Sequence, residues 1–97
     1  MLTIEPGLYL EGKHGVRIES VGVVVSHPEY QDFLSFNIVT RVPISPKLVE
    51  PSMLSQAEKA WLNAYNKICF DALSPLLQSP EDATVLAYLK KECTPLQ

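Results

Sequence analysis

The apolar and polar positions of this chain follow two different periods, one in each half. Up to about residue 42, apolar residues alternate with polar ones or form short β-branched runs, which is typical of strands. From about residue 55 they recur every three or four positions, which is typical of amphipathic helices. This order predicts an α+β fold, in which antiparallel strands are followed by two C-terminal helices.

The strand pattern occurs in four segments, residues 2–5, 7–11, 16–26 and 33–42. Glycines and charges at residues 11–15 predict a hairpin connection. Pro43 ends the last segment, because proline cannot donate a hydrogen bond to a strand ladder. Alternation within the longest segment places Arg17 and Glu19 on the same face.

The second half contains two signals for the start of a helix. Ser55 and Glu58 form a capping box, in which a serine caps the first turn and a glutamate three residues later bonds back to it. Ser79, Pro80 and two following acids are a second start signal. We expect loop or 3₁₀ helix over residues 47–54. The apolar face of the first helix comprises Trp61, Leu62, Tyr65, Ile68, Cys69, Ala72, Leu73 and Leu76.

The composition is that of an ordinary globular chain. Its 97 residues make at most one domain, and 46% of them are hydrophobic. A formal net charge of −3 favours neither nucleic acid nor an anionic membrane as a partner. The apolar runs are too short to span a bilayer. Cys69 and Cys93 lack the spacing of metal ligands, so we expect free thiols in a reducing cytosol.

Two glutamates lie in unusual surroundings for acidic residues. Glu5 ends an extended segment and is followed by Pro6, while Glu19 lies in an apolar, strand-like run that starts at Val16. Burying an unpaired carboxylate is costly, so such a residue lies at a solvated edge or binds something positive. On the pattern alone, both possibilities remain open.

The motifs around these glutamates resemble those of a known family. They are Thr3-Ile4-Glu5-Pro6-Gly7, Tyr9, Gly15-Val16-Arg17-Ile18-Glu19 with the run Val21 to Val25, Trp61 to Tyr65, and Tyr88 to Leu96. This set resembles the last part of aminopeptidase P (Xaa-Pro aminopeptidase), a family of the pita-bread metallopeptidases related to creatinase and methionine aminopeptidase. The resemblance implies that residues 1–46 are an incomplete C-terminal strand part of the catalytic domain. Residues 47–97 would be its helical C-terminal extension.

The resemblance also implies a metal site. The family holds two divalent metal ions, usually manganese, with two aspartates, one histidine and two glutamates. Glu5 corresponds to the first glutamate, Glu19 to the glutamate that bridges both ions, and Arg17 to an arginine beside these ligands. Carboxylate oxygens suit hard divalent ions, and an ion pair of this kind can clamp the water that attacks a peptide bond. The other three ligands would lie upstream, so we expect this chain alone to bind no metal and to be inactive.

The activity implied by the family is removal of an N-terminal residue from peptides with proline at the second position. The resemblance further implies a cytoplasmic enzyme and a homodimer formed through the C-terminal region. Nucleic acid and membranes are not expected partners. The strand pattern begins directly after Met1, so we expect the chain to be part of a longer protein.

Simpler interpretations of the same residues also have to be weighed. Glu5 and Glu19 could be solvated edge residues, and Arg17 could form an ordinary surface ion pair. We expect His14 and His27 to be solvated loop residues and not metal ligands.

Aromatic residues in such elements most often belong to the core. That is our expectation for Tyr9, although its ring could instead line the site. We expect Trp61 and Tyr65 to be packing anchors of the helix, and their exposure in this chain alone would agree with the dimerisation that the resemblance implies. Two alternative functions remain for the chain as a whole. It could be a non-enzymatic pita-bread binding module, or a small interaction or dimerisation domain.

Overall fold

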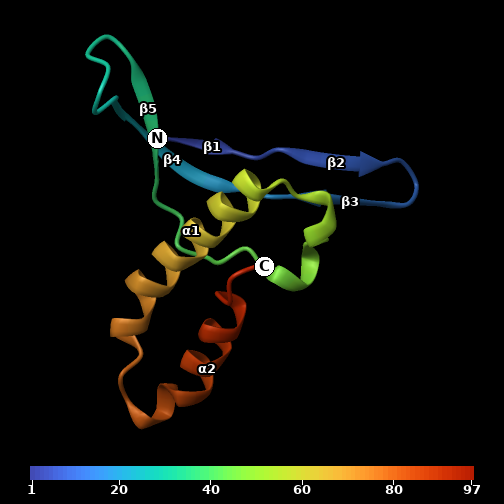
Figure 1. The fold of residues 1–97 in the computed structure, drawn as a ribbon, viewed down its shortest axis with the longest axis vertical. Helices are drawn as coiled ribbons and strands as arrows, with labels where there is room; N and C mark the ends of the chain where they lie inside the picture. Colours follow the sequence, from blue (N-terminus) through green and yellow to red (C-terminus); the bar gives the residue numbers. More distant parts are fainter. The chain divides into compact units, whose positions relative to one another are not determined.

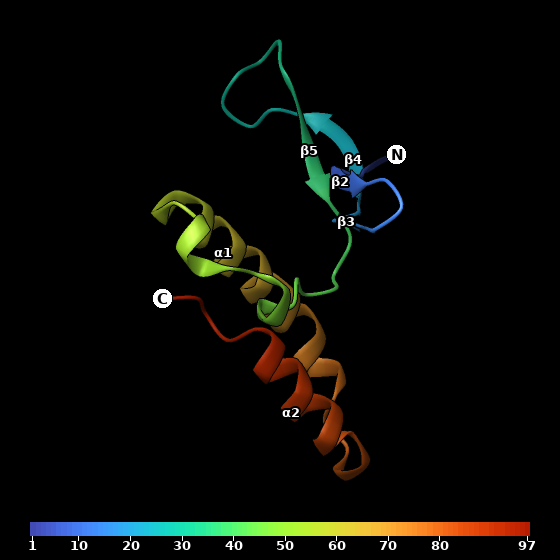
Figure 2. The ribbon, with the colours of Figure 1, turned by 90° about the vertical axis from the view of Figure 1, so that its right-hand side faces the viewer.

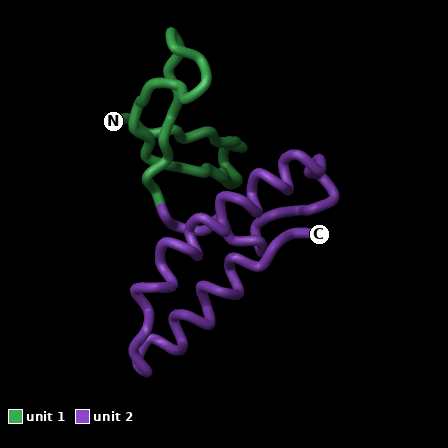
Figure 3. Tube along the Cα trace, turned by 60° about the vertical axis from the view of Figure 1, so that its left-hand side comes forward, with its two compact units in different colours: residues 1–40 green, residues 41–97 purple.

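The computed structural model describes all residues from Met1 to Gln97 and confirms the α+β fold class. It divides into two compact units, residues 1–40 and residues 41–97 (Figure 3). All strands lie in the first unit and all helices in the second (Figure 1). The assignment of residues 1–46 to a catalytic domain and of residues 47–97 to an extension remains a prediction.

The first unit contains two antiparallel sheets. Its strands are β1 (Leu2–Ile4), β2 (Gly7–Leu10), β3 (His14–Arg17), β4 (Ser20–Ser26) and β5 (Leu34–Ile38). One sheet has the order β1-β4-β5, and the other consists of β2 and β3. The β2–β3 connection needs Gly12, whose φ of 68° lies in the left-handed region that favours glycine.

Residues 2–22 form one interrupted hairpin, here called the long hairpin. Thr3 pairs with Val21 on one side of the interruption and Gly7 pairs with Arg17 on the other. The two registers are continuous, so residues 5 and 19 are opposite each other. The prediction of one strand over residues 16–26 is therefore wrong. The ladder is interrupted beside Pro6, which has no N–H to donate, although its carbonyl still accepts from Ile18 N–H at 3.1 Å.

The last strand is shorter than residues 33–42. Beyond Ile38, the side chain of Thr40 takes over a backbone role, because its Oγ1 accepts the N–H of Val21 at 2.8 Å. Val39 N–H donates to the carbonyl of Val21 at 2.9 Å. The ladder with β4 thus ends in a side-chain contact instead of a further backbone pair.

The second unit is a helical hairpin preceded by two 3₁₀ turns, as predicted for residues 47–54 (Figure 2). The helical segments are η1 (Pro46–Leu48), η2 (Pro51–Met53), α1 (Gln56–Leu73), η3 (Ser74–Leu76), η4 (Pro80–Asp82) and α2 (Ala83–Glu92). The capping box of α1 is confirmed: Ser55 N–H donates to Glu58 Oε2 at 2.8 Å, and Glu58 N–H donates to Ser55 Oγ at 3.3 Å. Neither α-helix is both long and apolar enough to cross a membrane.

The core of the second unit is small and partly polar. Leu62 and Cys69 of α1 and Leu89 of α2 are its buried apolar residues. Cys69 was expected there, whereas Trp61 lies outside this core and is 61% exposed. Asn66 is 1% exposed, a burial that no motif in the sequence predicted.

Two asparagines of α1 fasten the segments that flank the helical hairpin. Asn66 Nδ2 donates to the carbonyl of Ile44 and its Oδ1 accepts the N–H of the same residue, both at 2.9 Å. Asn63 pairs in the same way with both backbone groups of Leu96, at 3.0 and 2.8 Å. The sequence does contain a signal for the buried position of Asn66. This residue lies one helical turn after Leu62, and an amide on an apolar helix face needs a hydrogen-bond partner when it is buried.

Candidate metal centre

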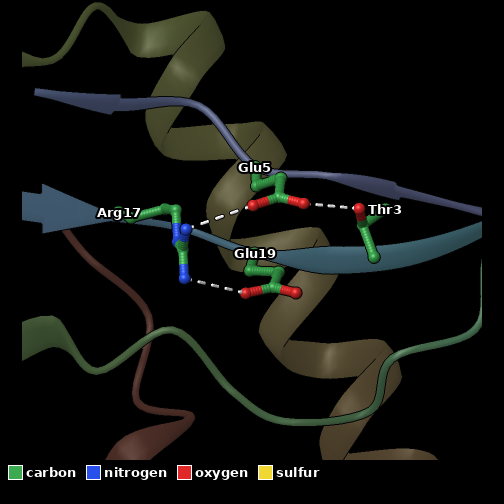
Figure 4. A network of polar contacts seen from close by, with 4 residues as sticks. All are labelled: Thr3, Glu5, Arg17 and Glu19. Atoms are coloured by element: carbon green, nitrogen blue, oxygen red, sulfur yellow. Dashed lines mark hydrogen bonds and ion pairs between the residues drawn. The ribbon is translucent and has the colours of Figure 1, made fainter.

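The structure brings Glu5, Arg17 and Glu19 together at the interruption of the long hairpin (Figure 4). Arg17 Nη1 lies 3.2 Å from Glu5 Oε2, and Arg17 Nη2 lies 3.4 Å from Glu19 Oε2. One guanidinium therefore spans both carboxylates. Thr3 adds a further contact, since its Oγ1 donates to Glu5 Oε1 at 2.6 Å.

Local geometry explains why these side chains meet. Glu5 and Glu19 occupy opposite positions, and Arg17 is two residues from Glu19, so alternation keeps all three on one face. We call this the carboxylate face of the long hairpin. The expectation that Arg17 and Glu19 point the same way is confirmed by their contact.

The electrostatics of the face leave it negative. Like charges directly opposite each other on paired strands are destabilising, and only one arginine balances the two carboxylates. The three side chains are 41–48% exposed, and ion pairs at such exposure contribute about 0–1 kcal/mol to stability. The arrangement thus gains little for folding, but it suits an additional cation.

The donor chemistry fits a hard divalent ion, which prefers carboxylate oxygens. No group of three or more His, Cys, Asp or Glu side chains gathers anywhere in the chain. Glu5 and Glu19 are the two residues here that could hold such an ion. Arg17 contacts one oxygen of each carboxylate.

Tyr9 also lies on the carboxylate face, and the expectation that it belongs to the core is wrong. Tyr9 pairs with Gly15, two residues along the hairpin from the pair of Gly7 and Arg17. Its side chain is 64% exposed. Even spacing from Glu5 places it on the same side of the hairpin. The sequence contained a signal for this placement, because Tyr9 follows Gly7 by two residues and Glu5 by four.

The two histidines lie elsewhere. His14 belongs to β3 and not to the turn, and it pairs with Leu10, a position that alternation assigns to the opposite face. His27 Nδ1 accepts the backbone N–H groups of Glu29 at 3.1 Å and of Tyr30 at 3.3 Å, so it shapes the loop after β4.

The cysteines have no place in the site. Both are free, Cys69 is fully buried, and Cys93 is partly buried. Burial raises the pKa of the Cys69 thiol and of the Cys93 thiol, which keeps both in the less reactive protonated form.

Comparison with known families gives the class of this protein. Residues 32–96, more than half of the chain, match the family described as the C-terminal region of peptidase M24. The chain belongs to this family.

Individual relatives extend the match to the long hairpin that contains the carboxylates. A probable Xaa-Pro aminopeptidase P of Laccaria bicolor is 42% identical in an alignment of 97 positions that covers 95% of this chain and 15% of the relative. The Xaa-Pro aminopeptidase ApepP of Drosophila melanogaster is 35% identical over 95% of this chain and 16% of its own length. This chain thus spans about a sixth of the curated relatives that it matches.

A solved structure agrees with the fold. The X-prolyl aminopeptidase of Caenorhabditis elegans, a cytosolic enzyme with a di-nuclear active site, superposes with a TM-score of 0.83 at 35% identity. The match covers 97% of this chain and 16% of the other. The resemblance to aminopeptidase P and the antiparallel strands followed by two helices are both confirmed.

Proposed function

We propose that this chain is the C-terminal part of a dinuclear-metal aminopeptidase that hydrolyses the bond between an N-terminal residue and a following proline. The observation that carries the proposal is the opposed pair of Glu5 and Glu19 on one face, spanned by Arg17. The names of the relatives, all Xaa-Pro aminopeptidases, support the substrate class.

The residues of the chain divide the work at this site. Glu5 and Glu19 would each supply a carboxylate to hold the divalent ions. Bound divalent ions would supply an activated water and polarise the scissile carbonyl. Arg17 orients both carboxylates through a forked contact that a single ammonium group cannot reproduce.

Further features of the proposal concern the complete enzyme. Manganese is the metal that we propose, and the cytoplasm is the compartment. A homodimer formed through the C-terminal region is supported by Trp61 and Tyr65, whose rings stack at 6.2 Å with 11° between their planes. Trp61 is largely exposed, and exposed aromatic anchors are frequent at the centre of protein interfaces.

The central test uses the complete protein that contains this chain, supplied with manganese. We expect it to cleave a peptide with proline at the second position and to spare the same peptide with alanine there. Glu19→Gln should lower kcat/KM by more than about 100-fold, because it removes a metal ligand and not merely one of its supports. Glu11→Gln, in the exposed turn of the same hairpin, is the matched control. A metal-loaded complete protein that leaves the proline peptide intact contradicts the proposal.

The isolated 97 residues provide a second test. Two ligands of five do not hold two ions, so we expect neither cleavage of the proline peptide nor tight, saturable binding of manganese in calorimetry. Saturable binding by the isolated chain that Glu5→Gln abolishes would show that these two carboxylates suffice, and would overturn this part of the proposal.

A further inference from the structure

Two glycines of the long hairpin lie directly beneath the side chain of Tyr9. A Cβ atom placed on Gly15, its partner across the hairpin, would lie 2.5 Å from Cδ1 of Tyr9. A Cβ atom placed on Gly7 would lie 2.5 Å from the hydroxyl oxygen of Tyr9. Neither distance is possible for a real side chain, so the ring occupies the space that both glycines leave empty.

Backbone conformation does not account for these glycines. Gly12 is the only residue of the chain with a positive φ, and nothing lies within 4 Å of a Cβ placed there. Gly22 would accept a Cβ at ordinary distances of 3.5–3.8 Å from its nearest neighbours. Gly7 and Gly15 thus differ from Gly12 and Gly22, because only at Gly7 and Gly15 does a side chain of the same hairpin occupy the space that a Cβ would take.

The glycines also set the direction of the ring. Cδ1, near the backbone of Tyr9, lies over Gly15, and the hydroxyl lies over Gly7, which is opposite Arg17. The tyrosine therefore points back along the hairpin toward Glu5. Residues two apart on a strand are separated by roughly 7 Å. The hydroxyl over Gly7 therefore lies about that far along the hairpin from the pair of Glu5 and Glu19, which is the next pair on the same face.

We propose that Gly7 and Gly15 are positioning residues, whose missing side chains hold the ring of Tyr9 along the carboxylate face and its hydroxyl next to the metal ligands. The inference rests on the proposed function, since it assigns the hydroxyl to the place where a peptide bound at the metals would lie. A Cβ on either glycine would lie 2.5 Å from the ring or its hydroxyl, so the side chain has to move away by roughly 1 Å to reach ordinary contact distance. Displacements of that size cost up to about 100-fold in rate.

The test is a double-mutant cycle in the complete protein. Gly7→Ala and Gly15→Ala should each lower kcat/KM for the proline peptide by about 10- to 100-fold in the presence of Tyr9. In a Tyr9→Leu background the same substitutions should change kcat/KM less than about twofold, because no ring remains to be displaced. Gly22→Ala, where a Cβ has room, is the matched control and should retain activity.

A second measurement is independent of activity. Crystal structures of the complete protein and of its Gly15→Ala variant should show the Tyr9 ring displaced from the hairpin in the variant. An unmoved ring, or equal losses with and without Tyr9, would overturn the inference. If the wild-type protein does not cleave the peptide, the proposed function fails, while the position of the ring still decides the role of the glycines.

Discussion

Arg17 is the residue on which the geometry of the carboxylate pair depends. Its two Nη atoms contact two different glutamates, which lie on opposite strands at an interruption of the ladder. In the isolated chain these contacts are exposed and contribute little to folding. We propose that they act through orientation, because each contact engages one oxygen of a carboxylate.

We predict that Arg17→Lys in the complete protein lowers kcat/KM by about 10- to 100-fold, since lysine keeps the charge but cannot span both carboxylates. Steady-state kinetics together with the metal content of the purified variant would measure the effect. Lys13→Gln, in the exposed turn of the same hairpin, serves as control. Full activity of Arg17→Lys would mean that charge alone matters at this position.

Helix α1 is the element that organises the second unit. Its asparagines bind both backbone groups of Ile44 and of Leu96, so the segments before and after the helical hairpin lie against the same helix. Tyr65 adds a hydrogen bond from its hydroxyl to the carbonyl of Val42 at 3.0 Å. Side-chain amides here replace the backbone partners that a strand would provide.

Replacing Asn66 by alanine should destabilise the chain by about 3 kcal/mol, because the buried amide is lost and the partly buried N–H and carbonyl of Ile44 lose their partners. Urea unfolding followed by circular dichroism would measure the loss. Asn37→Ala, at an exposed position of β5, should change the free energy of unfolding by less than about 0.5 kcal/mol. Equal effects of both substitutions would contradict the role assigned to Asn66.

The start of α1 should respond to acid. The hydrogen bond from the Ser55 hydroxyl lowers the pKa of Glu58 below its ordinary value of 4.5. A group with a lowered pKa in the folded state stabilises it above the unfolded pKa, and this contribution is lost as pH falls through the folded pKa. We expect the stability of wild type to fall more steeply from about pH 6 to about pH 3 than that of Glu58→Gln, which keeps a capping side chain but does not titrate.

At the scale of the whole molecule, the strand unit has open edges. In the order β1-β4-β5, both β1 and β5 have a single neighbouring strand. Leu34 and Phe36 of β5 are 70% and 56% exposed. An exposed edge with apolar side chains is a template for pairing with another chain.

We therefore predict that the isolated chain self-associates through these edges, as sedimentation velocity at increasing concentration would show. Phe36→Lys should shift the distribution toward monomer, because it replaces an exposed apolar side chain of the edge strand by a charged one. Asn37→Lys adds the same charge at the neighbouring position, on the other face of the strand, and serves as the matched control. A wild-type chain that stays monomeric at high concentration would contradict the prediction.

Local patterns in the sequence were sufficient for most of the elements and for the metal-site candidates. The capping box at Ser55 and Glu58, the 3₁₀ turns and the cysteine core position follow from short-range rules, and the structure agrees with them. The motifs around Glu5 and Glu19 identified the family because they are short and contiguous. Their role as ligands stays a prediction.

Only the tertiary structure decided how these parts meet. Continuous register across the interruption at Pro6 sets Glu5 opposite Glu19, a relation between residues 14 positions apart that no local pattern contains. The buried place of Asn66 depends on where Ile44 lies, and the exposed place of Tyr9 depends on two glycines of the same hairpin. Local propensity acts over a few residues, whereas partners across a ladder or beneath a ring are chosen only when the chain has folded.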